Sequence, residues 1–210
     1  MYGKNSDGVG NPPLIDADRR LVSKPSGGKN EDDAVNGRIY HLTLGAWTST
    51  IAAGNINAFA AAASTQFAVW NPVGSGVNVV LLKFATFPIS GTTPVAGCFH
   101  SKFQLTPVLA STAVSPVTSG LIGTTAAPKA GYITSAAGSA LTGSGAATLI
   151  RAADFYITAG TAANLVGARC VEYVDGDITL GPGWGWAPTW KAAGTAYLGG
   201  YSVSWKEVDV

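Results

Sequence analysis

Residues 67–87 contain two apolar runs on either side of a cluster of turn-forming residues, and this pattern limits the fold more than any other stretch. The runs are rich in Val, Phe and Trp, which favour β-strands. Between them, Asn71-Pro72 favours turn initiation, and Gly74 and Gly76 tolerate backbone angles that a Cβ would obstruct. Residues 77–82 are apolar at nearly every position, so both faces of this strand are expected to be covered, in a sandwich interior or at a subunit interface.

Other strand-like runs follow, separated by turn residues about every 8–12 residues. The clearest is 196–208, where large apolar and small polar residues alternate. Residues 105–148 are low in complexity and predicted to form loops and short strands, while 51–63 fits a short helix or a loose strand pair. The pattern predicts an all-β fold, an antiparallel β-sandwich of the jelly-roll kind. The predicted strands cover residues 39–44, 67–71, 77–87, 95–104, 148–158, 165–174, 178–180, 184–186 and 196–208.

Charge is distributed unevenly along the chain. Six Lys/Arg and six Asp/Glu lie within residues 1–38, whereas residues 39–150 carry three lysines and no carboxylate. The net charge of +1 gives no electrostatic reason to expect nucleic acid or an anionic membrane as a partner. Polar residues interrupt the uncharged span 42–67, so no transmembrane helix is expected. The change in character predicts an extended N-terminal arm, residues 1–38, and a sandwich domain, residues 39–210.

The arm is polar, with scattered apolar residues, and cannot bury enough apolar surface to fold alone. We expect it to lie along a neighbouring subunit or partner. A disordered tail and an arm folded back on its own domain are the alternatives. The residues expected to make polar contacts with the partner are Arg19, Arg20, Arg38, Asp16, Asp32 and Asp33.

No residue pattern predicts catalysis, a cofactor or a metal site. Cys98 and His100 lie on one face of a predicted strand, but no orienting carboxylate is near them in sequence. A zinc site that adds Cys170 and His41 has no support from their spacing. Two cysteines are too few for a disulfide framework, so both are expected to be buried thiols. No nucleophile elbow and no His-Glu-x-x-His motif occurs.

The tryptophans of one Gly/Pro-rich stretch raise a binding hypothesis. Exposed rings at Trp184, Trp186 and Trp190 would stack on the faces of sugars, whereas the simpler interpretation is packing in the core or at an interface. Asp175 and Asp177 leave a sugar-cleaving enzyme as a third option, although Asp-Gly-Asp is typical of a turn.

Three segments make the chain similar to small virion proteins of tailed bacteriophages. They are Pro-Val-Gly-Ser-Gly at 72–76, Asp-Gly-Asp-Ile-Thr-Leu-Gly-Pro-Gly at 175–183 and Tyr-Ser-Val-Ser-Trp-Lys-Glu-Val at 201–208. With the Ala/Gly/Ser/Thr-rich centre, they resemble β-sandwich proteins, often trimeric, that decorate or cement capsids or form head and tail appendages. The resemblance covers residues 65–210 and leaves the arm unmatched.

The resemblance implies a role in assembly with no catalytic residues. We expect a homotrimer made in the host cytoplasm and bound to the outer surface of the virion, as a capsid decoration or cement protein. Its partner would be the major capsid protein or another virion protein. Threefold closure would bury apolar strand faces such as 77–82 and 201–205. The alternative is a virion appendage, a fibre or spike, that binds a host receptor or glycan through the loop 184–190.

Overall fold

The computed structural model describes residues 30–44, 65–91, 96–104, 112–113, 117–139, 148–157, 170–192 and 197–210. The chain divides into two compact units, residues 1–32 and 33–210, and the architecture below is that of the second. None of the helices in the described ranges has the length and apolar character needed to cross a membrane.

The described part of the chain is nearly all β, as predicted. Its one helix is α1 (Glu31–Val35). The strands are β1 (Ile39–Leu44), β2 (Thr65–Asn71), β3 (Val77–Gly91), β4 (Ala96–Gln104), β5 (Thr112–Ala113), β6 (Thr118–Ser119), β7 (Gly131–Ser139), β8 (Thr148–Ile157), β9 (Cys170–Tyr173), β10 (Thr179–Leu180), β11 (Trp184–Ala192) and β12 (Tyr197–Asp209).

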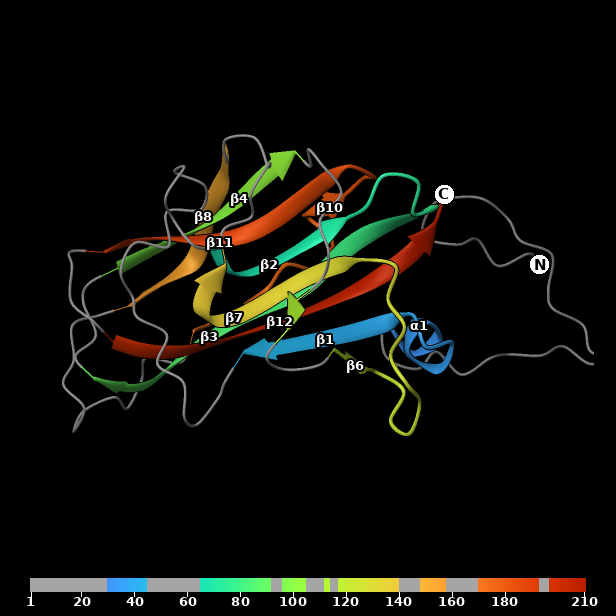
Figure 1. Ribbon diagram of the computed structural model, residues 1–210, viewed down its shortest axis with the longest axis horizontal. Helices are drawn as coiled ribbons and strands as arrows, with labels where there is room; N and C mark the ends of the chain where they lie inside the picture. Colours follow the sequence, from blue (N-terminus) through green and yellow to red (C-terminus); the bar gives the residue numbers. More distant parts are fainter. Residues whose placement is uncertain are drawn as a thin grey trace, which may run out of the picture. The chain divides into compact units, whose positions relative to one another are not determined.

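The strands form two sheets that pack face to face (Figure 1). The first has the order β10-β3-β12-β1-β6, with β9 also paired to β3, and we call it the first sheet. The second sheet has the order β5-β7-β2-β11-β4-β8. All described pairings are antiparallel except that of β5 with β7. The predicted antiparallel sandwich is therefore confirmed.

The pairing is nested, which is the signature of a jelly roll. β1 pairs with β12, β2 with β11, β3 with β9 and β10, and β4 with β8. Successive pairs alternate between the sheets, and the β3–β12 and β4–β11 pairings complete them. A long hairpin rolled into two layers produces this order, with two Greek-key connections. β5, β6 and β7 lie between β4 and β8 in the chain and extend the sheet edges.

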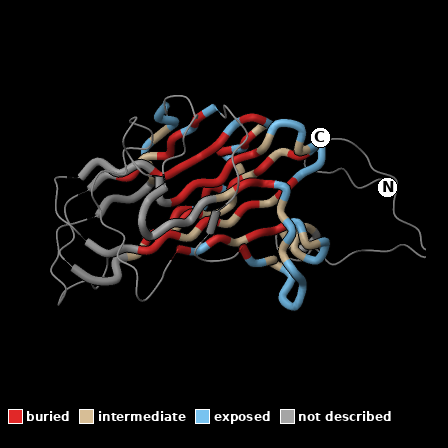
Figure 2. Tube along the Cα trace, in the orientation of Figure 1, coloured by how far each residue is buried: buried red, intermediate tan, exposed pale blue. Residues whose placement is uncertain are grey.

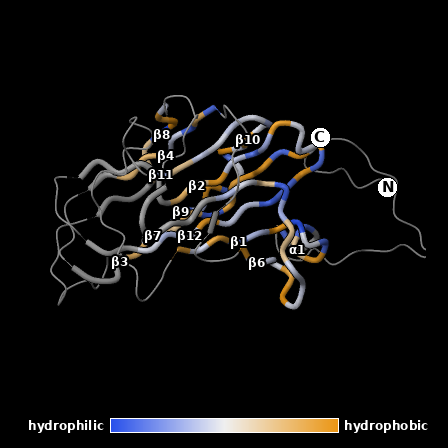
Figure 3. Tube along the Cα trace, in the orientation of Figure 1, coloured by the Kyte–Doolittle hydropathy of each residue, from blue (hydrophilic) through white to orange (hydrophobic). Residues whose placement is uncertain are grey.

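The core lies between the two sheets. Phe67 and Trp186 come from the second sheet, Phe84 and Tyr201 from the first, and their rings meet edge-on or tilted at centroid distances of 5.3–6.4 Å. Figure 2 shows buried segments running along the strands of both layers. In Figure 3 the strands are largely pale or orange, and the blue hydrophilic stretches are short. The low charge of the sequence thus reflects strands with few charged positions.

The face of β12 that was predicted to be buried by threefold closure is already buried within one chain. Tyr201, Val203 and Trp205 are at most 1% exposed because they point into the sandwich core. The interface prediction for these residues is wrong. The same holds for the inward half of 77–82, since Val79 and Leu81 belong to the same core.

The opposite face of the second sheet is also buried in part. Along this sheet, Trp70 pairs with Gly131 and with Gly185, and Gly185 pairs with Phe103. The rings of Trp70 and Phe103 lie over the glycine positions opposite them, where a Cβ would overlap the ring atoms. Both aromatic side chains are at most 1% exposed. Cross-strand glycines thus make room for two rings lying flat on the sheet.

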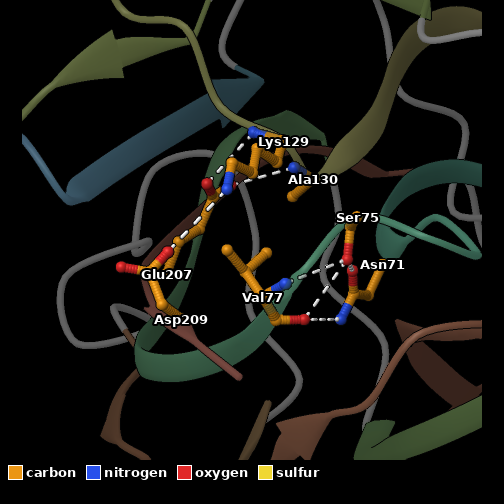
Figure 4. Close-up of polar contacts among 7 residues, drawn as sticks. All are labelled: Asn71, Ser75, Val77, Lys129, Ala130, Glu207 and Asp209. Carbon is orange, nitrogen blue, oxygen red and sulfur yellow. Dashed lines mark hydrogen bonds and ion pairs between the residues drawn. The ribbon is translucent and has the colours of Figure 1, made fainter.

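The predicted turn at 71–76 is confirmed, and its asparagine ties three segments together. Gly74 and Gly76 have positive φ values of 76° and 72°. The Asn71 amide donates to the backbone oxygen of Val77 at 2.7 Å (Figure 4). It also donates to the backbone oxygen of Leu180 at 2.8 Å. Its oxygen accepts from the Ser75 hydroxyl at 2.6 Å. Asn71 therefore fixes the turn and the end of β10.

The C-terminal end of the predicted arm is helical, which corrects the expectation of an extended chain there. Asn30 and three acidic residues at the start of α1 favour a helix N-terminus. Gly37, with φ 67°, donates to Ala34 O at 3.0 Å, and Arg38 N donates to Asp33 O at 2.8 Å. This pair of bonds is a Schellman motif, which ends the helix. Residues 1–29 of the predicted arm lie outside the described residues.

Candidate functional site

The charged residues assigned to partner contacts separate into two groups. Arg19 and Arg20 lie outside the described residues. Asp33 forms an ion pair with Lys206 of β12, with 2.9 Å between Oδ2 and Nζ. Arg38 is exposed, and its backbone oxygen accepts from Glu207 N at 3.1 Å. Asp32 lies in α1, and its side chain is outside the described set.

The three tryptophans also differ in position. Trp186 is fully buried in the sandwich core, so its ring is not available to a ligand, and this part of the binding hypothesis is wrong. Trp190 pairs with Cys98 in the β11–β4 ladder, and its side chain is not described. Trp184, the first residue of β11, is 39% exposed. Alternation places Trp184 and Trp186 on one face, but Trp184 stands at the rim, where the core ends.

Trp184 borders an open groove with a volume of about 630 Å³. The groove lies where β8, the edge strand of the second sheet, approaches β10, at the edge of the first. The Lys102 ammonium lies over the Trp184 ring at 5.3 Å from its centroid. We call this site the Trp184 groove. Its lining residues are Lys102, Thr148, Leu149, Ile150, Asp177, Ile178, Thr179, Leu180, Gly181 and Trp184.

A buried polar network crosses the sandwich near the same edge. Glu172 of β9 points inward and accepts a hydrogen bond from His100 Nε2 of β4 at 2.9 Å. Its other oxygen, Oε1, lies 2.6 Å from an Arg151 guanidinium nitrogen on β8. Trp186 Nε1 lies 3.0 Å from His100 Nδ1. The network therefore joins the two sheets through three charged or titratable side chains.

The network determines the tautomer of His100. An indole N–H can only donate, so His100 Nδ1 must accept the hydrogen bond from Trp186. The ring proton is then on Nε2 and is donated to Glu172. His100 is neutral in this arrangement, and the Arg151 guanidinium balances the Glu172 charge. Both His100 and Glu172 are at most 2% exposed, so this arrangement ties the sheets together and presents no reacting group to solvent.

The outer face of the first sheet carries two cross-strand rows, in which serine and threonine side chains of β1 and β12 lie beside residues of other types. One row contains His41, Ser204, Lys83 and Tyr173, and the next contains Thr43, Ser202, Ala85 and Val171. His41 Nδ1 is 2.7 Å from Ser204 Oγ, and Thr43 donates to Ser202 Oγ at 3.2 Å. We call these eight residues the Ser/Thr face. Burial and the nearby Lys83 charge lower the pKa of His41.

No family model, no curated protein and no solved structure matches this chain.

Of the four residues in the zinc hypothesis, Cys98 and His41 lie in different sheets, and the side chain of Cys170 is outside the described set. Cys98 and His100 share one face of β4, as predicted, and both are buried in the sandwich, where Cys98 is a reduced thiol. His41 lies on the outer face of the first sheet, because its neighbour Leu42 points into the core. Across the described ranges, no group of three or more His, Cys, Asp or Glu side chains gathers as metal ligands.

The sequence analysis missed residues of the buried polar network and of the Trp184 groove. The alternation in β9 places Glu172 on the same face as the buried Val174, which signals a carboxylate that needs a partner inside the fold. Lys102 and Leu149 of the groove carry no such signal, because their proximity to Trp184 arises only from strand pairing.

Proposed function

We propose that this protein is a structural component of a virus particle, a capsid decoration or cement protein that acts by binding and not by catalysis. It would form a homotrimer on the outer surface of the shell and contact the major capsid protein or another virion protein. The observation that carries the proposal is the Ser/Thr face, an outward sheet surface in which five of the eight side chains are short and uncharged and Lys83 alone carries a full charge.

Such a surface suits protein association for an energetic reason. Short side chains lose little rotamer freedom when they are buried, so ordering them at an interface costs less than ordering Lys, Arg or Glu. Lys83 is the only charged residue in the two rows, and it lies 5.3 Å from the centroid of the Tyr173 ring. A partner could therefore cover this face and desolvate a single charge. The jelly-roll topology supports the proposal as well, since viral capsid domains use it.

A charge placed on the Ser/Thr face tests the proposal. Thr43 is exposed, so Thr43→Arg leaves the fold intact while introducing a long charged side chain in the proposed interface. Light scattering after size exclusion is expected to give a trimer for the unmodified chain and a monomer for Thr43→Arg. The matched control is Val73→Arg, at a 70% exposed turn position, which is expected to remain trimeric. A monomeric unmodified chain at micromolar concentration would refute the trimer.

Shell binding is tested separately through the arm. Reversal of charge in Arg19→Glu/Arg20→Glu is expected to abolish co-sedimentation with capsid shells that lack this protein, while the trimer persists. Loss of the trimer in this variant would contradict a docking role for the arm.

The second candidate function, a virion appendage that binds a host receptor or glycan, is favoured by one observation, the Trp184 groove.

A further inference from the structure

The Trp184 groove exposes large apolar side chains that a folded domain would normally cover. Leu149 is 49% exposed, Ile150 40% and Trp184 39%. Leu149 and Ile150 lie at the start of β8, and Trp184 begins β11, so all three are in sheet strands. An apolar cluster that stays open to solvent at one concave place is typical of a ligand site.

The polar groups of the groove are few and balanced in charge. Lys102 supplies an ammonium group and Asp177 a carboxylate, and both residues are exposed. Thr148 and Thr179 add hydroxyl groups, and Thr179 Oγ1 donates to Gly176 O at 3.3 Å, which leaves its oxygen able to accept. With one positive and one negative side chain, the groove favours a neutral ligand over a phosphate or a nucleotide.

The wall that carries Trp184 is fixed before any ligand arrives. Gly183, with φ 86°, donates to Asn71 O at 2.8 Å, and Trp184 N donates to Gly181 O at 3.2 Å. The Asn71 amide also donates to the backbone oxygen of Leu180 at 2.8 Å. A rigid turn of this kind lowers the entropy lost on binding, because the aromatic ring is already held at the rim.

From these features we propose that the Trp184 groove binds a neutral oligosaccharide. A pyranose ring has an apolar C–H face, which packs on an indole, and hydroxyl groups at its edge, which bond to a carboxylate, an ammonium and threonine hydroxyls. The groove offers both in one concavity, with Leu149 and Ile150 beside the polar groups. This surface shares no residue with the Ser/Thr face, so sugar binding and shell assembly can fail independently.

Saturation-transfer NMR on the full chain tests the proposal with three probes. They are the N-acetylglucosamine trimer, maltohexaose and the acidic sugar trigalacturonate, each at millimolar concentration. Transfer to at least one neutral probe is expected, and Trp184→Ala should weaken its affinity by about 10–30-fold. The matched control is Ile122→Ala, which removes a 96% exposed apolar side chain outside both the groove and the Ser/Thr face and is expected to leave the affinity unchanged.

A second variant keeps the proposal testable if Trp184→Ala fails to fold. Asp177→Asn keeps the shape of an exposed turn and is expected to weaken the same affinity by at least about tenfold, through loss of a charge-assisted hydrogen bond. No transfer to either neutral probe, or equal affinity in Trp184→Ala and the unmodified chain, would overturn the proposal. Binding of trigalacturonate alone would also overturn it, because Lys102 would then select an anion. A trimer that binds no sugar would leave the assembly proposal standing.

Discussion

The rings that lie flat over glycines make the substitution Gly185→Ala a sharp test of the packing. An ideal Cβ at Gly185 would come within 2.7 Å of Phe103 Cε1 and closer still to Cζ and Cε2. Carbon atoms pack at about 3.5–4.0 Å, so the ring would have to move by roughly 1 Å or more. Phe103 is 1% exposed, so its ring cannot move away from the new methyl group without disturbing buried packing.

Overpacking of this kind costs about 1–3 kcal/mol, and the gain from restricting the unfolded chain at a Gly→Ala site offsets about 0.4–1 kcal/mol of it. For a domain of this size a mid-range net loss of about 1–2 kcal/mol lowers Tm by roughly 2–8 °C. The measurement is thermal and urea unfolding followed by tryptophan fluorescence. The control is Gly181→Ala, where the nearest atom to a new Cβ is Asn78 Oδ1 at 4.0 Å, and its Tm is expected to change little or rise.

A double-mutant cycle shows whether the ring itself is responsible. In a Phe103→Leu background the smaller side chain leaves room for the new methyl group, so Gly185→Ala should cost less there by at least about 0.5 kcal/mol. Equal costs in the two backgrounds, or an unchanged Tm for Gly185→Ala alone, would refute the contact between this ring and the glycine.

Three further predictions concern buried or half-buried polar groups. Glu207 accepts hydrogen bonds from the backbone nitrogens of residues 129 and 130 at 3.0 and 2.9 Å (Figure 4). In urea titrations, Glu207→Gln should therefore lower the free energy of unfolding by about 1–3 kcal/mol. The control Asp209→Asn, in an exposed ion pair, should change it by less than about 0.5 kcal/mol. Glu172→Ala should cost about 3 kcal/mol in the same assay, because a buried ion pair and a hydrogen bond are lost together, and a cost below about 1 kcal/mol would contradict the network. The lowered pKa of His41 disfavours its protonation in the folded state, so the free energy of unfolding should decrease as the pH falls below 6.5, the pKa of an ordinary histidine. The urea concentration at the unfolding midpoint should therefore decrease between about pH 7.5 and about pH 5.5. This decrease should be smaller in His41→Gln.

Local patterns were sufficient to predict most of the strands. The strand at 39–44 has the predicted bounds, because its large residues alternate with polar ones and turn residues flank it. The turn at 71–76 follows from residue chemistry alone, since Gly74 and Gly76 occupy positive φ. In 105–148, where Ala, Gly, Ser and Thr give little contrast, the prediction of short strands missed the length of β7 (Gly131–Ser139).

Features that depend on strand pairing could not be predicted from local patterns. Trp184 and Trp186 are two positions apart on β11, so their side chains point to the same face of the sheet, yet Trp184 lies at the rim and Trp186 in the core. Only the position of the strand end relative to the opposite sheet decides between them. Trp70 and Phe103 cover glycines on the face of the second sheet that points away from the core. No periodicity within one strand encodes a glycine on its neighbour.

The buried network and the groove depend on each other through the edge that they share. One wall of the groove belongs to β8 in the second sheet and the other to β10 in the first, and no strand pairing joins β8 to β10. The Arg151–Glu172 ion pair crosses between the sheets next to both walls, since Arg151 follows Ile150 and Glu172 lies in β9, just before the turn that leads into β10. Loss of this ion pair removes one of the two described polar links that Glu172 makes between the sheets, the other being its hydrogen bond with His100. Glu172 should therefore act as a positioning residue for the groove, and a folded Glu172→Gln variant should bind the neutral sugar more weakly although Glu172 does not line the site. Unchanged sugar affinity in that variant would show that packing alone holds the walls apart.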